Sequence, residues 1–149
     1  MSGTAVNRVT VLPHGLELLI EESLAEGYSM LQRLKDNWET GVNTFSLPGE
    51  AYFEARRGET LVGVTGLNRD PYDASPSVGR LRHLYVLPGE RRSGVGRLLV
   101  ENSLTHARAH FSVVHLRTPH GDAKASRFYE ALGFQPVSGN EHATHQMML

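Results

Sequence analysis

The stretch that decides the fold runs from Arg80 to Val100 and reads R-L-R-H-L-Y-V-L-P-G-E-R-R-S-G-V-G-R-L-L-V. Residues 81–87 are rich in apolar and β-favoured side chains, which predicts a largely buried strand. Pro88 and Gly89 end that strand in a turn. Apolar residues at helical spacing follow from Leu98 onward. The stretch therefore predicts a strand, a turn and the start of a helix.

The pattern Arg91-x-x-Gly94-x-Gly96 lies between the turn and the helix. Glycine has no side chain, so the backbone can approach a ligand closely there. The first N–H groups of a helix lack partners within the helix, and the helix dipole favours an anion at that end. Arg92 and Arg97 add positive charge. The pattern predicts a cradle for phosphate or pyrophosphate.

Two other phosphate-binding motifs are absent from this stretch. A dinucleotide-binding turn would read G-x-G-x-x-G, and a P-loop would contain Gly-Lys followed by Ser or Thr. The chain has neither pattern after the strand. The alternative to a phosphate cradle is a plain strand, turn and helix that binds no ligand.

Length and composition are typical of one soluble globular domain spanning residues 1–149, with 40% hydrophobic and 21% charged residues. Fifteen basic and 16 acidic side chains give a net charge of −1, which argues against nucleic-acid binding. The chain has no cysteine, so disulfides, thiolate metal sites and thiol nucleophiles are excluded. Residues 1–20 lack a signal-peptide pattern and no apolar run reaches membrane-spanning length. We expect a cytosolic protein without membrane contact.

The remaining patterns predict an α/β fold. Further strands are expected at 5–12, 51–56, 60–67, 112–118, 134–137 and 141–149, two helices between 15 and 40, and one helix each after Gly94 and Asp122. The intervening residues 68–79 are expected to form a long, functional or mobile loop. This order predicts a mixed central sheet of about six or seven strands flanked by about four helices.

Two motifs in this order of elements resemble the GCN5-related N-acetyltransferase (GNAT) superfamily. They are the strand and loop Leu84-Tyr85-Val86 with Arg91-x-x-Gly94-x-Gly96, and the helix Ala125-x-x-Phe128-Tyr129-x-x-Leu132-Gly133-Phe134. The order of elements extends the resemblance over nearly the whole chain. One departure is Asp122, where the family often has Asn. Asp still caps a helix, but its charge changes any polar contact with the cofactor.

The resemblance implies direct transfer of an acetyl group from acetyl-CoA to a primary amine, without a metal. We expect the acceptor to be a small molecule and the protein to be a homodimer, because the family is often dimeric. Backbone N–H groups of the strand would polarise the thioester carbonyl, and those of the loop would bind the pyrophosphate. The implied cofactor-binding residues are Leu84, Tyr85, Val86, Arg91, Arg92, Ser93, Gly94, Val95, Gly96, Arg97, Asp122, Ala125 and Phe128.

The resemblance also implies that Tyr129 is the general acid. Phenol and thiol pKa values, about 10 and about 8.5, permit proton transfer to the leaving thiolate. A half-buried packing role beside Phe128 is the alternative. The family's base positions align with Arg80 and Arg82, and arginine is no base near neutral pH. His83 is the candidate base, provided that a bulge turns it to the right face; a water chain or an already neutral amine is the alternative.

Other candidates have structural interpretations. His106 and His110 lie four residues apart on the predicted helix, which is metal-pair spacing, but we expect them to pack. Asp70, Tyr72 and Asp73, in the long loop, either meet a cationic amine or are solvated.

Two other functions stay open at this point. One is acetylation of protein lysines or N-termini. The other is CoA binding without turnover, because the central strand lacks a carboxylate; Tyr129 and the intact glycine loop argue against it.

Overall fold

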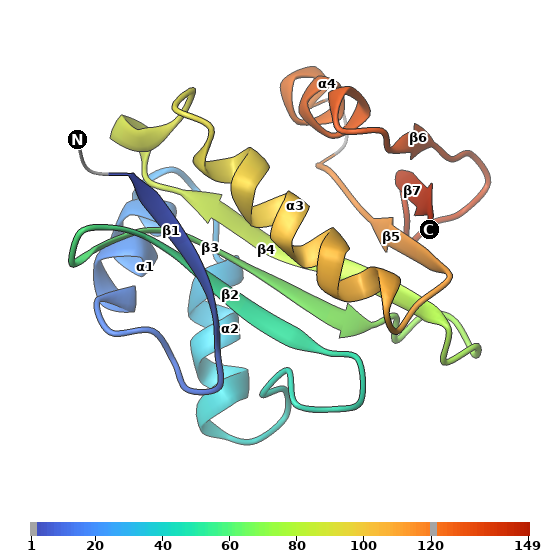
Figure 1. The fold of residues 1–149 in the computed structure, drawn as a ribbon, viewed down its shortest axis with the longest axis horizontal. Helices are drawn as coiled ribbons and strands as arrows, with labels where there is room; N and C mark the ends of the chain where they lie inside the picture. Colours follow the sequence, from blue (N-terminus) through green and yellow to red (C-terminus); the bar gives the residue numbers. More distant parts are fainter. Residues whose placement is uncertain (1–2, 120–121) are drawn as a thin grey trace.

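The computed structural model describes residues 3–119 and 122–149, so His120, for which the sequence predicts no role, lies outside the described residues. Helices and a single mixed sheet make up these residues (Figure 1). The helices are α1 (Leu16–Ala25), α2 (Met30–Glu39), the 3-10 turn η1 (Pro88–Glu90), α3 (Val95–Arg108) and α4 (Ala123–Ala131). The strands are β1 (Thr4–Val9), β2 (Ala51–Arg57), β3 (Thr60–Arg69), β4 (Val78–Val86), β5 (Val113–Leu116), β6 (Gln135–Pro136) and β7 (His145–Met148).

The sheet has seven strands within the described residues, in the order β1-β2-β3-β4-β5-β7-β6. All neighbours are antiparallel except β4 and β5, which run parallel. Helices α1 and α2 cover one face of the sheet and α3 crosses the other (Figure 1). This arrangement confirms the predicted α/β fold with a mixed sheet flanked by helices.

Apolar side chains fill both faces of the central strands. Leu19, Leu31 and Val64 belong to the cluster between α1, α2 and the sheet, whereas Leu99 and Val100 of α3 are buried in the clusters on the other face. A sheet covered on both sides buries nearly every side chain, which explains why β3 reads as an apolar run rather than as an alternation. No helix in the described part of the chain is long and apolar enough to cross a membrane.

The strand β4 is longer than predicted. It begins at Val78 rather than Leu81, so the preceding loop shrinks to residues 70–77. Gly79 suggested a loop, but it is a strand residue on which the ring of Phe111 lies: a Cβ atom at Gly79 would come within 2.8 Å of Phe111 Cδ2. The glycine is there to make room for packing, which the sequence of this stretch alone does not distinguish from a turn.

A bulge interrupts the pairing of β3 with β4. Val64 lies opposite Tyr85 and Gly66 lies opposite Arg82, so His83 and Leu84 share one position of β3. His83 has a φ of 62°, which is uncommon for a residue with a side chain. A bulge of the kind that the prediction for His83 required is therefore present, and the His83 ring contacts Phe45 in the cluster of α1 and α2.

Candidate active site

The strands β4 and β5 diverge along their length. They pair only from Val78–Arg80 to Val113–His115, whereas β4 continues to Val86. Among the described residues, no strand pairs with the β5-facing edge of β4 beyond that point. The two ribbons separate toward α4 in Figure 1. The central strand therefore has a free edge in the middle of the sheet, where most strands are paired on both sides.

The free edge presents backbone donors. The N–H of Leu87 donates to the carbonyl oxygen of Val62 on β3 at 2.9 Å. Successive N–H groups of a strand point to opposite edges. The N–H groups of Val86 and Leu84 therefore point away from β3, toward the free edge. These are two of the groups that the resemblance assigned to the thioester.

The start of α3 supplies a second set of donors beside this edge. Gly94 is the N-cap with φ 87°, and it makes no side-chain cap hydrogen bond. A Cβ atom at Gly94 would meet nothing within 4 Å, whereas at Gly96 it would come within 3.3 Å of the Phe128 ring. Gly94 thus serves the backbone turn and leaves open space, while Gly96 lets α4 pack close. The first N–H groups of α3, from Val95 on, are available to an anion.

Arg91, the first arginine of the loop motif, holds the loop in place through its hydrogen bonds. Arg91 donates to both carboxylate oxygens of Glu26, at 2.8 and 2.7 Å, and to the carbonyl oxygen of Val86 at 3.0 Å. Tyr85 donates to the same carboxylate at 2.5 Å. The hydrogen bond from Arg91 is the main cause that lowers the pKa of Glu26. Arg91 therefore fixes the loop to the end of α1 and is already occupied.

Two other side chains of the loop, Ser93 and Arg97, also have partners. The Ser93 hydroxyl donates to the Glu90 carbonyl oxygen at 2.5 Å, and Arg97 pairs with Glu101 at 3.2 Å on the exposed face of α3. Arg92 adopts a left-handed φ of 68°. Backbone N–H groups, more than side chains, are thus the donors that the loop offers to a ligand.

Helix α4 begins as the sequence predicts. The Asp122 carboxylate accepts a hydrogen bond from the N–H of Ala125 at 2.9 Å, which confirms it as the N-cap. Its negative charge also lies at the positive end of the α4 dipole.

Tyr129 on α4 packs between two aromatic rings. Its ring makes edge contacts with Phe128 and Phe134, at centroid distances of 5.1 and 5.7 Å. It borders the same apolar cluster as Leu84, which follows the bulge in β4. Burial raises the pKa of Tyr129, so its hydroxyl keeps its proton at neutral pH. The position and protonation state both suit a proton donor beside the free edge.

His83 is neutral but is a poor base. Burial, together with the charges of Arg82 and Arg33, lowers the pKa of His83 to about 3. Its ring lies 6.1 Å from that of Phe45, on the α1–α2 side. A general base works best with a pKa near the working pH. The lowered pKa therefore favours the other two routes for the amine proton, water or an amine that arrives neutral.

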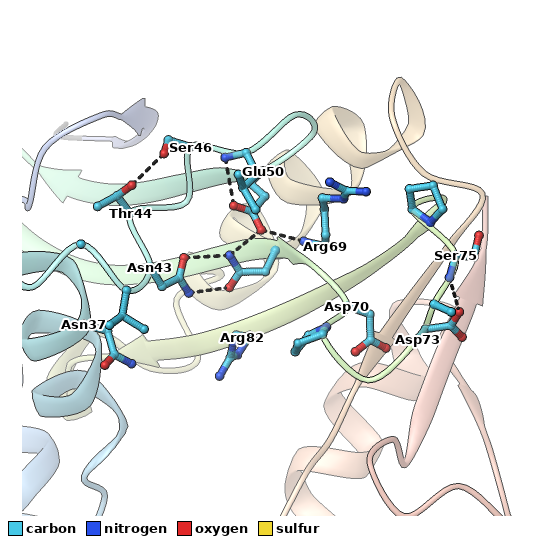
Figure 2. Close-up of a pocket in the computed structure, with 17 residues that line it drawn as sticks. Asn37, Asn43, Thr44, Ser46, Glu50, Arg69, Asp70, Asp73, Ser75 and Arg82 are labelled. Carbon is cyan, nitrogen blue, oxygen red and sulfur yellow. Dashed lines mark hydrogen bonds between the residues drawn. The ribbon is translucent and has the colours of Figure 1, made fainter.

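A pocket of about 640 Å³ opens on the α2 side of the sheet. It is bounded by the connector between α2 and β2, the end of β3, the loop before β4, and Arg82 (Figure 2). Asn43 and Asn68 exchange two hydrogen bonds of 3.0 Å, and Glu50 accepts from Asn68 at 2.9 Å. This network joins the connector to β3 and holds that wall of the pocket in place.

The loop side chains that were candidates for binding an amine are engaged with the protein. Asp70 is buried, accepts from His115 at 2.9 Å and lies 3.8 Å from Arg80. Tyr72 stacks on His142 at 3.9 Å and lies under the Arg80 guanidinium. Sequence reasoning gave His115 no role, because its partner is far away in the chain. Asp70 therefore holds the pocket rim together.

The pair His106 and His110 packs, as predicted. The two rings lie 4.7 Å apart and His106 also contacts Phe53 at 6.1 Å. Within residues 3–119 and 122–149, no three acidic or histidine side chains are grouped so that they could hold a metal ion.

The splayed β4–β5 pair and the glycine-rich start of α3 lie within the part of the chain that a family model matches. The family model described as "Acetyltransferase (GNAT) family" matches residues 16–134. The chain therefore belongs to the GNAT acetyltransferase family, whose members use acetyl-CoA as a substrate.

Solved structures agree with this assignment. A protein from Exiguobacterium sp. 255-15, classed as an acetyltransferase, is 29% identical, with a TM-score of 0.85 over 98% of this chain and 93% of that one. An acetyltransferase from Streptococcus agalactiae 2603 is 20% identical, with a TM-score of 0.78 over 100% of both chains. A GNAT-family protein from Desulfovibrio desulfuricans is 19% identical, with a TM-score of 0.77 over 98% and 99%. The last two support the fold alone. No curated protein sequence matches the chain.

Proposed function

We propose that the protein is an N-acetyltransferase that moves an acetyl group from acetyl-CoA directly to the primary amine of a small molecule. The observation that carries this proposal is the free edge of β4 next to the start of α3, whose glycine N-cap makes no side-chain hydrogen bond. Together they supply donors for a thioester carbonyl and for a pyrophosphate, in that order along the chain.

In this proposal the N–H groups of Leu84 and Val86 polarise the thioester carbonyl, and those of Val95 to Arg97 bind the pyrophosphate. The amine nitrogen attacks the carbonyl carbon, a C–N bond forms and the C–S bond breaks. The Tyr129 hydroxyl gives its proton to the departing sulfur, and water takes the proton that the amine loses. One backbone donor of this kind contributes about a hundred- to a thousandfold in rate.

The direct route follows from composition. The chain has no cysteine, so it lacks the thiol that would carry the acetyl group in a two-step mechanism. In this proposal the acceptor lies in the pocket beside Arg82, because Arg82 directly precedes the bulge of β4 and lines that pocket. Its volume of about 640 Å³ is within the range of small-molecule sites, about 300 to 1,000 Å³.

The test is release of CoA thiol from acetyl-CoA, followed across a panel of small amines and lysine- or N-terminal-amine peptides. We expect release with small amines. Release with peptides alone would replace the small-molecule acceptor by a protein. Thermal stabilisation by CoA without release for any amine would identify a binding protein without turnover. A cytosolic location and a homodimer remain predictions.

A further inference from the structure

Arg82 is a side chain of the pocket that has no ion-pair partner among the described residues. It is partly buried and lines the pocket directly before the bulge of β4. Within residues 3–119 and 122–149, its guanidinium makes no hydrogen bond and lies within 4.0 Å of no carboxylate. Figure 2 shows Arg82 apart from the network of Asn43 and Glu50.

The carboxylates nearest to this charge have other donors. Glu50 accepts hydrogen bonds from the Asn68 side chain and from the N–H groups of Leu47 and Arg69, at 2.9 to 3.1 Å. Its charge is thus compensated by three donors, none of them Arg82. The buried carboxylate cannot turn toward Arg82 without leaving one of these donors unpaired.

The carboxylate of Asp70 also has partners other than Arg82. It accepts from His115 at 2.9 Å and from the N–H of Tyr72 at 3.0 Å, and it lies 3.8 Å from Arg80. Arg80, two residues before Arg82, forms an ion pair with Asp70, although its buried Nη1 has no hydrogen-bond partner among the described residues. Arg82, in contrast, has no carboxylate partner in the described part of the chain and is available to an anion that enters the pocket.

An unpaired, partly buried guanidinium is costly, because arginine keeps its charge in proteins. Burial is the main cause that lowers the pKa of Arg82, and the charge of Arg33 on α2 lowers it further, whereas Tyr72, Asp70 and Glu50 act in the opposite direction. An anion that enters the pocket would remove this penalty. The planar guanidinium matches a carboxylate best, because two N–H groups can donate to its two oxygens.

We propose that the acceptor amine also carries a carboxylate, and that Arg82 binds it. The inference rests on the proposed function and specifies its substrate as an amino acid or a related amino carboxylate. The same positive charge has a second effect, because it disfavours a neighbouring ammonium and so promotes the neutral amine that must attack. Arg82 thereby compensates for the lack of a strong base on β4.

The test compares α- and ω-amino acids, each beside its own carboxamide, as acceptors in the thiol-release assay. We expect kcat/KM to be at least about tenfold higher for the acid, since a charged hydrogen-bonded pair contributes that much. Arg82→Gln should abolish the preference and Arg82→Lys should keep part of it. The matched control is Arg69→Gln, which removes an equal charge from another wall of the same pocket.

The proposal is overturned if wild-type protein does not prefer acids, or if Arg69→Gln rather than Arg82→Gln removes the preference. Should no amine provoke release, the proposed function fails, and the inference is tested by binding instead. N-acetyl amino acids should then raise the melting temperature of wild type more than their carboxamides do, and Arg82→Gln should abolish that difference. Equal shifts for acids and carboxamides would contradict the role of Arg82.

Folding of the variant provides a second readout. Without a ligand, Arg82→Gln should melt at or above the temperature of the wild-type protein, because it removes an unpaired buried charge. A clear fall in melting temperature would mean that Arg82 is a structural residue, and would overturn the proposal.

Discussion

Tyr129 is held between Phe128 and Phe134, and burial keeps its hydroxyl protonated. If this hydroxyl protonates the departing sulfur, Tyr129→Phe should lower kcat by about a hundredfold while the KM for acetyl-CoA stays nearly constant. Tyr28→Phe, at an exposed tyrosine, is the control and should behave as wild type. An unchanged kcat for Tyr129→Phe would show that the ring only packs.

His83 makes stability depend on pH. Its pKa falls from the ordinary 6.5 to about 3 in the folded protein, so the unfolded chain binds an extra proton between these values. Stability is therefore fully present above pH 6.5 and is lost progressively as pH falls toward 3. Asn tolerates the positive φ of this position better than most residues.

We expect His83→Asn to lose less stability on acidification than the wild-type protein does. Between pH 7.5 and pH 5 the difference should be about 1–2 kcal/mol in the free energy of unfolding, measured with urea. Parallel losses in the two proteins would show that His83 is not desolvated as described.

The start of α3 depends on its glycine cap. Gly94→Glu should weaken CoA binding by at least about tenfold, because it strains a φ of 87° and places a negative charge where the pyrophosphate would lie. Gly139→Glu is the matched control, since Gly139 also has a positive φ of 77° and a Cβ atom there would meet nothing within 4 Å. Calorimetric titration with CoA measures both. Intact affinity for Gly94→Glu would mean that the cradle is elsewhere.

The start of α4 depends on Asp122. Asp122→Ala removes the hydrogen bond to the N–H of Ala125 and should destabilise the protein by about 1 kcal/mol. Asp122→Asn keeps a capping oxygen and should retain nearly all of that stability. Thermal unfolding measures the difference. Equal destabilisation by the two substitutions would show that the charge, rather than the cap, matters.

At the scale of the whole molecule, the sequence predicted what local patterns encode. The order of strands and helices, the glycine turn into α3 and the Asp122 cap all depend on residues near one another in the chain. The bulge at His83 does not, because it is defined by the pairing of β4 with Val64 and Gly66 on another strand. The Asp70–His115 contact likewise joins segments that only the parallel β4–β5 pair brings together.

The pocket was unpredictable for the same reason. Its walls come from separate segments, and the sequence does not reveal which charges the protein pairs internally. Asp70 was a candidate for binding the amine and turns out to be a structural carboxylate. Arg82 counted only as a missing base, whereas its guanidinium lines the pocket without an ion-pair partner among the described residues.

The central claim is that acetyl-CoA lies along the free edge of β4 with its pyrophosphate at the start of α3. Titration of isotope-labelled protein with CoA, followed by amide NMR, tests it directly. The largest shifts should be those of the N–H groups of Leu84 and Val86, and of Val95 to Arg97. Shifts concentrated elsewhere on the molecule, or no shifts at millimolar CoA, would contradict the account.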